Sequence, residues 1–309
     1  MMTDRKKVLI SDLSLLLVAA MWGGGFSFTK NILQYLTPLY FLAFRFMLAA
    51  LVLALIFYPK VKTATKQDIK SSLFVGLFLT VAFVSQTVGL LFTTPGKQAF
   101  ITSAYVVIVP FLSYLVIRRK PARKEILGAF LCMIGLALLS LTRDLQVNLG
   151  DLLTLVSAVG FAGHIVVIGV YANQVNTAVM NVWQFLLAGT VCLVLAIFLE
   201  PFPEAIAFPA VYSMVYLVLF SSIGAFMIQV TAQKYTYPTH AGIILSMEAV
   251  FGALFAYLFW REIFTLPMMI GCLIILAAIL ITEVDFTRKK DSVQYLKPVS
   301  TASMKNGEQ

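Results

Sequence analysis

Charged side chains are scarce in this chain of 309 residues: Asp, Glu, Lys and Arg make up 12% of it, against about 25% in ordinary soluble domains. Hydrophobic residues make up 60% and follow one another in long runs with hardly a break. A soluble domain of this size needs more polar surface to cover its core. The shortage of charge therefore excludes a water-soluble fold and predicts that lipid surrounds most of the surface.

Residues that carry metal or catalytic chemistry are also few. The chain has two histidines, and its three cysteines, Cys132, Cys192 and Cys272, lie in separate apolar runs without CxxC spacing. This pattern predicts packing residues and neither a disulfide framework nor a zinc site. The sequence contains no HExxH, GxSxG or GxxxxGK[ST] motif. We therefore expect no enzyme, no cofactor, no metal site and no ATP-driven pump with its nucleotide site on this chain.

The apolar runs predict an all-α membrane protein with ten transmembrane helices, taking about 20 apolar residues for one crossing. Helices are expected because unpaired backbone groups are too costly in lipid. No small-residue cleavage site follows the first run, so we expect it to remain in the protein. The predicted ranges are 12–32, 39–58, 71–92, 98–117, 125–142, 151–171, 179–199, 211–233, 241–260 and 266–283.

The positions of the basic residues predict an orientation, and they explain the net charge of +9 without a nucleic-acid partner. With residues 1–10 in the cytoplasm, the cytoplasmic segments hold 18 of the 23 Lys and Arg residues. This asymmetry predicts a bacterial cytoplasmic membrane protein with both termini inside. Residues 286–309 lack apolar periodicity and are expected to form a disordered cytoplasmic tail. The exceptions to the asymmetry are Lys30, Arg45, Lys97, Arg143 and Arg261.

The chain also repeats itself. Residues 86–141 superpose without a gap on residues 229–284, and polar residues match as well as apolar ones. The sequence therefore predicts two five-helix repeats, over 11–143 and 150–284, the second inverted because five crossings precede it. Many secondary transporters build a midplane site with alternating access on such repeats. Matching pairs include Asp12 with Asp151, Arg45 with Gln184, Gln86 with Gln229, Thr93 with Thr236, Pro95 with Pro238 and Ser103 with Ser246.

Several short elements of this sequence resemble the drug/metabolite transporter superfamily, with two EamA-type repeats. They are Trp22-Gly23-Gly24-Gly25-Phe26, Arg45, Pro110, Glu262, Ile126-Leu127-Gly128-Ala129 and Met269-Ile270-Gly271-Cys272. The sequence departs from the family pattern at Arg119, where an acidic residue is expected. The resemblance implies a central cavity formed by helices 1, 3, 4, 6, 8 and 9, and the export or exchange of amino acids and other metabolites.

Glu248 is the sharpest site candidate, because an ionisable group at membrane depth costs about 3 kcal/mol or more. It is either a carboxylate for proton coupling or for a substrate amine, or a buried carboxyl held by donors such as Tyr105. Gln98, Thr102 and Tyr105 follow at i, i+4 and i+7 and predict one polar face of helix 4. That face either lines the cavity or bonds to another helix.

Five further polar or aromatic residues are candidates with structural alternatives. Gln86 and Gln229 match across the repeats and suit either substrate contacts or bonds between helices. His164 is either a proton carrier or a neutral hydrogen-bonding group. Trp22 beside three glycines suits a cavity wall, while Arg45 most simply snorkels or ties helices together, with binding of a substrate carboxylate as the minor alternative.

The leading hypothesis is a secondary transporter, an exporter or exchanger of a small organic metabolite such as an amino acid. Its expected partners are the lipid bilayer and that metabolite, and protons are a candidate coupling ion. The alternatives are an uptake permease of the same fold or a membrane receptor or scaffold that transports nothing. Short connectors without a soluble domain disfavour the receptor.

Overall fold

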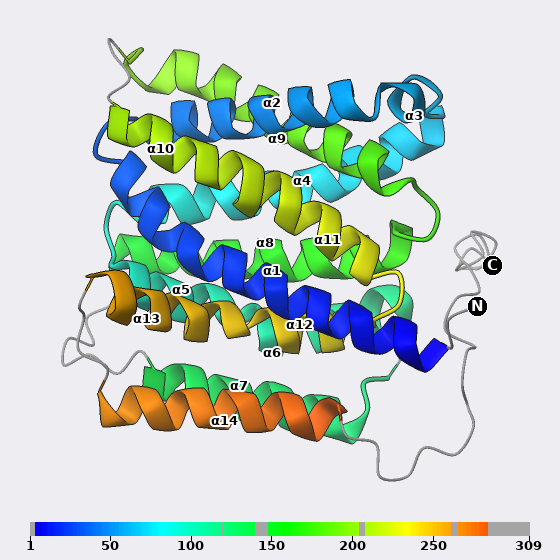
Figure 1. Cartoon of the computed structure of the whole chain (residues 1–309), viewed down its shortest axis with the longest axis vertical. Coiled ribbons are helices and arrows are strands. Elements are labelled where there is room, and N and C mark those ends of the chain that lie inside the picture. Colours follow the sequence, from blue (N-terminus) through cyan, green and yellow to red (C-terminus); the bar gives the residue numbers. More distant parts are fainter. Residues whose placement is uncertain (1–3, 119, 140–147, 204–207, 261–264, 284–309) are drawn as a thin grey trace, which may run out of the picture.

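The computed structural model describes residues 4–118, 120–139, 148–203, 208–260 and 265–283. Within these ranges the secondary structure is helical and no strand occurs, which confirms the predicted all-α membrane fold (Figure 1). Four residues singled out in the sequence, together with the predicted tail 286–309, lie outside the described ranges. These four are Arg119, Arg143, Arg261 and Glu262.

Seven helices form the first half of the chain. They are α1 (Asp4–Ile32), α2 (Pro38–Ile56), α3 (Tyr58–Lys62), α4 (Lys66–Gly89), α5 (Pro95–Ser103), α6 (Tyr105–Ile117) and α7 (Arg123–Leu139). Local sequence signals start several of them. Proline occupies the first turn of α2 and α5, where its missing N–H has no cost, and Thr65 with Asp68 forms a capping box for α4.

The second half repeats this arrangement. Its elements are α8 (Leu149–Tyr171), α9 (Thr177–Leu199), α10 (Phe208–Tyr216), the π-helical segment η1 (Leu217–Gly224), α11 (Ala225–Ala232), α12 (Pro238–Leu245), α13 (Met247–Trp260) and α14 (Leu266–Glu283). Asn148 and Asp151 form a capping box at the start of α8, as Thr65 and Asp68 do for α4. The two halves thus use the same devices to start their helices.

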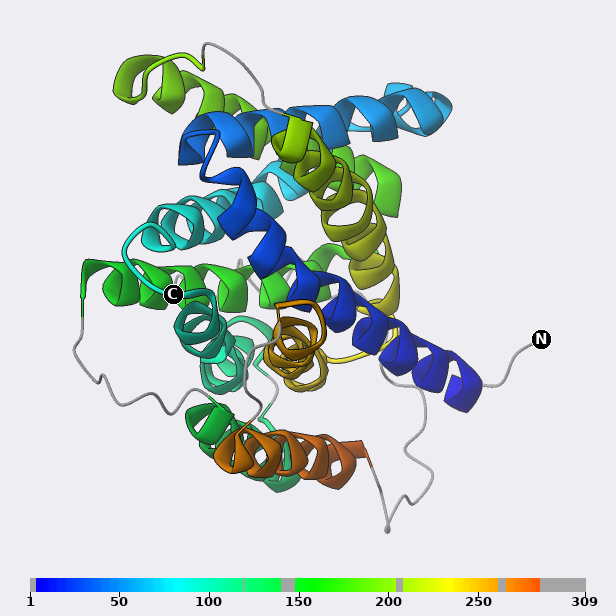
Figure 2. The ribbon, with the colours of Figure 1, turned by 60° about the vertical axis from the view of Figure 1, so that its left-hand side comes forward.

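Eight helical stretches of the described chain are long and apolar enough to cross a membrane, and α14 is a shorter apolar helix. The multi-span fold predicted from hydropathy is therefore confirmed. α14 lies beside α7 at one edge of the bundle in both views (Figure 1, Figure 2). The eight stretches are 6–32, 38–56, 66–89, 97–117, 149–171, 177–199, 208–232 and 238–255.

Two helices that were predicted to be continuous are broken in the middle. The range 98–117 divides into α5 and α6 at Ala104, and the range 241–260 divides into α12 and α13 at Ser246. The two breaks lie one residue apart in the repeat alignment, since Ser246 is the repeat mate of Ser103, the residue before Ala104. Discontinuous helices near the midplane expose backbone groups and are the usual place for transporter sites.

The helices pair across the halves in a symmetric way. α4 packs on α8 as α11 packs on α1, while α2 pairs with α9 and α7 with α14. Small residues allow the closest approaches between helices, as expected in lipid. A Cβ placed on Gly23 of α1 would come within 2.7 Å of the backbone nitrogen of Gly252 in α13.

The basic segments share one end of the bundle. The start of α1, the helix α3, the start of α7 and the connection between α11 and α12 all lie at that end, on the right of Figure 1. The connection between α4 and α5, which precedes Lys97, lies at the opposite end (Figure 1). This arrangement agrees with the charge asymmetry, and the sidedness itself stays a prediction.

Candidate functional site

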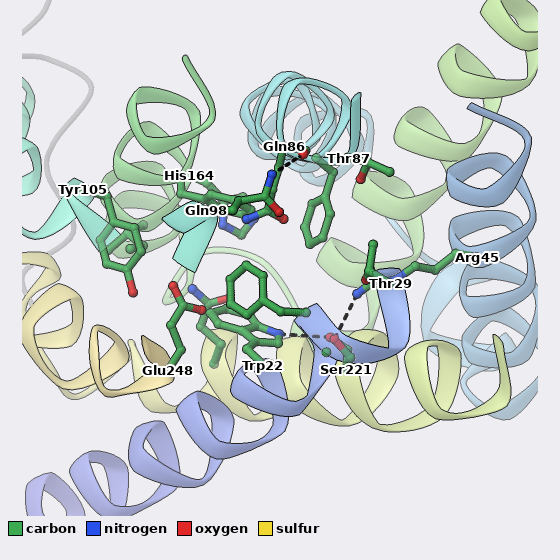
Figure 3. Close-up of a pocket in the computed structure, with 16 residues that line it drawn as sticks. Trp22, Thr29, Arg45, Gln86, Thr87, Gln98, Tyr105, His164, Ser221 and Glu248 are labelled. Atoms are coloured by element: carbon green, nitrogen blue, oxygen red, sulfur yellow. Dashed lines mark hydrogen bonds between the residues drawn. The ribbon is translucent and has the colours of Figure 1, made fainter. Parts of the chain in front are cut away.

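A pocket lies inside the bundle where the two halves meet. It is lined by helices from both halves: α1, α4, α5, α6, α8, η1, α11 and α13, with one contribution from α2. Seven of the eight predicted site residues line it, and Thr102 does not. The lining residues are Trp22, Gly25, Phe26, Thr29, Arg45, Phe83, Gln86, Thr87, Gln98, Tyr105, Phe161, His164, Ile165, Ser221, Gln229 and Glu248 (Figure 3).

Glu248 stands at one end of the pocket, in the first turn of α13 and two residues after the break at Ser246. Its side chain is 5% exposed. Tyr105, the first residue of α6, points its hydroxyl toward the Glu248 carboxyl group (Figure 3). The buried hydroxyls of Tyr105 and Ser103 face this carboxyl group and have no other hydrogen-bond partner within the described chain. The broken helices α5–α6 and α12–α13 therefore bring a carboxyl group and spare hydroxyls to one place.

Arg45 stands at the other end of the pocket (Figure 3). Its side chain is buried in the bundle, which favours the expected tie between helices over snorkelling. The guanidinium donates from Nε to Ser222 Oγ at 2.8 Å and from Nη2 to Ser221 Oγ at 3.0 Å. It also lies 4.8 Å from the centre of the Phe83 ring. Arg45 thus ties α2 to the π-helical segment η1.

Neither of these two charged groups has a charged partner within the described residues. Figure 3 places the Trp22 side chain between the Glu248 end and the Arg45 end of the pocket. Trp22 Nε1 donates to the backbone oxygen of Ser221 at 3.0 Å, and its ring packs against Phe226 with centroids 5.2 Å apart. The pocket therefore combines one carboxyl group, one guanidinium and an aromatic wall.

The two repeat-matched glutamines have different surroundings. Gln86 Nε2 donates to Thr102 Oγ1 at 3.2 Å, and Gln98 Nε2 donates to the Gln86 backbone oxygen at 2.6 Å, so these groups join α4 to α5. Gln229 is fully buried, and neither its amide nitrogen nor its amide oxygen has a partner within the described residues. Buried amides are normally paired, so the free amide of Gln229 is unusual and leaves both a donor and an acceptor available in the pocket lining.

Thr102 bonds to Gln86 and stays out of the pocket lining, although the sequence predicted one face for Gln98, Thr102 and Tyr105. That face assumed a regular helix, and the break at Ala104 lies between Thr102 and Tyr105. His164 Nε2 lies 2.9 Å from Gln184 Oε1. Its ring lines the pocket with one nitrogen already engaged.

The sequence patterns gave too little weight to Arg45, and of the aromatic wall they indicated Trp22 but not Phe83 or Phe161. Arg45 was expected near a helix end, whereas it lies two turns inside α2. Its position in an apolar run was the available signal. Phe83 and Phe161, whose ring centroids are 5.2 Å apart, carry no signal because phenylalanine is common throughout this chain. Within the described residues, no group of three His, Cys, Asp or Glu side chains could hold a metal ion.

Two repeated sets of membrane-spanning helices around a buried polar pocket are an arrangement on which many membrane transporters are built. The model of the EamA-like transporter family matches residues 9–141 and 148–284. The chain therefore belongs to the EamA-like transporter family of the drug/metabolite transporter superfamily, and it is a membrane transporter.

Individual relatives agree with this assignment. The chain is 32% identical over 277 residues to an uncharacterized transporter of Archaeoglobus fulgidus, covering 90% of this chain and 87% of the relative. It is 23% identical to the uncharacterized transporter YoaV of Bacillus subtilis, covering 92% and 99% of the two chains. A solved structure titled "Crystal structure of protein" has the same fold, with a TM-score of 0.73 at 16% identity and coverage of 90% and 96%.

Proposed function

We propose that this protein is a secondary transporter that exports or exchanges an amino acid or a similar zwitterion across a bacterial cytoplasmic membrane. The substrate occupies the central pocket and becomes accessible from each face of the membrane in turn. The end of the bundle that carries the basic segments faces the cytoplasm, since cytoplasmic loops are enriched in Lys and Arg.

The observation that carries this proposal is the pair of opposite charges in one buried pocket. A buried charge without a partner is costly, and the described residues provide no counter-ion for Glu248 or Arg45. A zwitterion compensates both charges at once, with its ammonium group at Glu248 and its carboxylate at Arg45. Because Trp22 lies between these two residues, the two charged groups of the substrate must be separated along its chain, as in an ω-amino acid, rather than bonded to one carbon as in an α-amino acid. A guanidinium is well suited to a carboxylate because it donates two parallel hydrogen bonds.

The groups between the two charges fit the remainder of such a substrate. Trp22, Phe83 and Phe161 offer an apolar wall to a side chain, and the free amide of Gln229 offers one donor and one acceptor. Sites of this kind bind mostly through apolar surface and use a few polar groups to fix the orientation of the ligand.

Glu248 also supplies a means of coupling. An ammonium group and a proton compete for the same carboxylate, so a proton that enters from one side displaces the substrate amine. Because the proton and the substrate compete for Glu248 at both faces of the membrane, the entry of protons drives the export of substrate. The repeat symmetry and the matched breaks beside Tyr105 and Glu248 support a pocket that opens at alternate ends.

A binding screen tests the substrate class. Purified protein is heated with amino acids, with their N-acetyl derivatives, which lack the ammonium group, and with their amides, which lack the carboxylate. We expect intact amino acids to raise the melting temperature, because a ligand at 100 times its Kd adds about 2.7 kcal/mol to the stability of the native state. Both derivatives should stabilise less.

The variant Arg45→Gln provides the matched control. It should lose the preference for the intact carboxylate while it keeps the preference for the free amine. Stabilisation by sugars, nucleosides or organic cations but not by amino acids would refute the zwitterion. Counterflow in vesicles tests transport and its direction, and binding without any flux would favour the scaffold alternative.

A further inference from the structure

Two aspartates that match across the repeats make the same set of contacts at different places. Asp151 of α8 accepts a hydrogen bond from Thr93 Oγ1 at 3.0 Å, and it forms an ion pair with Lys97 Nζ at 2.6 Å. Asp12 of α1 accepts a hydrogen bond from Thr236 Oγ1 at 2.9 Å, and His240 Nε2 lies 3.5 Å from its Oδ1. Thr93 and Lys97 are the repeat mates of Thr236 and His240.

Each of these sets joins one repeat to the other. Asp151 belongs to the second repeat and holds the connection between α4 and α5 of the first, whereas Asp12 belongs to the first and holds the connection between α11 and α12 of the second. Figure 1 shows these two connections at opposite ends of the bundle. The pocket lies between them, so one inter-repeat contact stands at each end of the path to the pocket.

The contacts are mechanically connected to the pocket. The short helix α5 runs from beside Thr93 to the break before Tyr105, and the short helix α12 runs from beside Thr236 to the break before Glu248. A movement at the outer end of either helix therefore reaches a residue that lines the pocket. The adjoining break provides a hinge for it.

We propose that these two sets of residues are latches that close the two ends of the transport pathway in turn, with α5 and α12 as the moving half-helices. This proposal rests on the proposed transport function and adds the gating residues to it. The latches alternate because opening one end requires the bonds of that end alone to break.

The two latches are chemically unequal. Lys97 forms a close ion pair with Asp151, whereas His240 lies farther from Asp12 and is charged only when protonated. The latch at the Lys97 end is therefore the tighter one. The empty protein should rest with that end closed and with the end at the start of α1, the predicted cytoplasmic end, open more often. This bias suits an exporter, which loads from the cytoplasm.

Thiol labelling from each side of the membrane tests the latches. Thr87→Cys places a thiol in the pocket, and a membrane-impermeant maleimide is added to either face of oriented vesicles. Labelling is read from the peptide that contains position 87, so the native cysteines can stay. Lys97→Met should raise labelling from the Lys97 end about fivefold, the effect of about 1 kcal/mol, and lower it from the other end. His240→Ala should produce the opposite change.

The controls separate the latch from helix capping. Lys97→Met leaves the capping box of Asn148 and Asp151 intact, and Asp68→Asn weakens the equivalent cap of α4, at which Asp68 accepts hydrogen bonds from Thr65 alone among the described residues. Asp151→Asn should therefore shift labelling, whereas Asp68→Asn should not. A disulfide between cysteines introduced at Lys97 and Asp151 should restrict labelling to the other end and stop transport.

The outcomes distinguish the two proposals. If Lys97→Met and His240→Ala change labelling in the same direction, or change it no more than Asp68→Asn does, the latches are refuted while transport stands. If position 87 of the otherwise unchanged protein is reached from one face only, whatever substrate is added, alternating access fails. The latches then fail with it.

Discussion

Arg45 and Glu248 are the two charged residues in the lining of the pocket, and the protein treats them differently. The guanidinium of Arg45 has two serine hydroxyls and the faces of phenylalanine rings around it, so much of its burial cost is offset without a carboxylate. The carboxyl group of Glu248 has spare hydroxyls nearby but no cation within the described chain. We therefore expect Glu248 to be the more sensitive of the two to what enters the pocket.

The substitution Glu248→Gln tests this expectation directly. The amide keeps the size of the side chain but cannot take up a proton, so flux should lose its dependence on pH while the protein stays folded. The measurement is substrate flux in proteoliposomes across a range of about two pH units, with thermal melting as the check on folding. If the mutant retained the pH profile of the original protein, Glu248 would have no part in coupling.

Glu200→Gln is the matched control for that experiment. Glu200 accepts hydrogen bonds from the backbone nitrogens of Leu39 and Tyr40 at 3.0 and 3.1 Å, and it caps the start of α2 away from the pocket. The same chemical change at this position should lower stability slightly and leave the pH profile unchanged.

Polar residues of the site were predictable one by one, because any polar group stands out in a run that lipid surrounds. This signal identified Glu248, Tyr105 and Gln229, all of which line the pocket, although their roles remain predictions. It could not separate a group that faces a ligand from one that bonds to a neighbouring helix. Gln86 and Gln229 match in sequence, yet one is paired and the other is free, since the difference depends on Thr102 in another helix.

At the scale of elements, the breaks at Ala104 and Ser246 were missed for a physical reason. Proline is the usual cause of a break, and the one in this region, Pro110, lies inside the continuous helix α6. At the second break, Ser246 donates from its hydroxyl to the backbone oxygen of Ile243 at 2.7 Å, a local bond that offers the backbone an alternative to the helix. Tertiary packing decides whether that alternative is taken.

The close contact between α1 and α13 can be tested by comparing substitutions at two glycines that face each other. A Cβ on Gly23 would lie 2.7 Å from the Cβ of Phe251 and 2.8 Å from the backbone oxygen of Glu248, so Gly23→Ala must push the two helices apart. A Cβ on Gly252 would meet the Gly23 oxygen at 3.5 Å, an ordinary contact. Gly23→Ala should cost about 1–3 kcal/mol, and Gly252→Ala should cost much less.

Thermal melting of the two variants in detergent measures the difference. Because the clash at Gly23 involves the backbone of Glu248, Gly23→Ala should also weaken substrate binding in the fraction that folds. Equal melting temperatures for the two variants would contradict the close packing of α1 on α13.

For the whole molecule, hydropathy and the internal repeat predicted the architecture well. Both signals are distributed over many residues, so errors at single positions do not matter. The boundaries of the helices were less predictable, as α1 shows by starting at Asp4 rather than near residue 12. The polar start of this helix lacks the apolar run on which the prediction depended.

The orientation of the molecule can be tested with two exposed positions. Thr63, between α3 and α4, lies at the basic end, and Gln34, between α1 and α2, lies at the other end. A thiol introduced at Thr63 should react with an impermeant reagent in inside-out vesicles, and one at Gln34 should react in intact cells stripped of their outer layers. The reverse pattern would invert the predicted sidedness.

In the proposed transport cycle, the opposite signs of Arg45 and Glu248 would also determine how the membrane voltage acts. One elementary charge carried across 100 mV changes the energy by about 2.3 kcal/mol. With the two charges of the pocket cancelling, the empty carrier reorients almost without an electrical penalty, and so does a carrier filled with a zwitterion. Only the proton on Glu248 would feel the field, so the electrical part of the driving force would act on the return step alone.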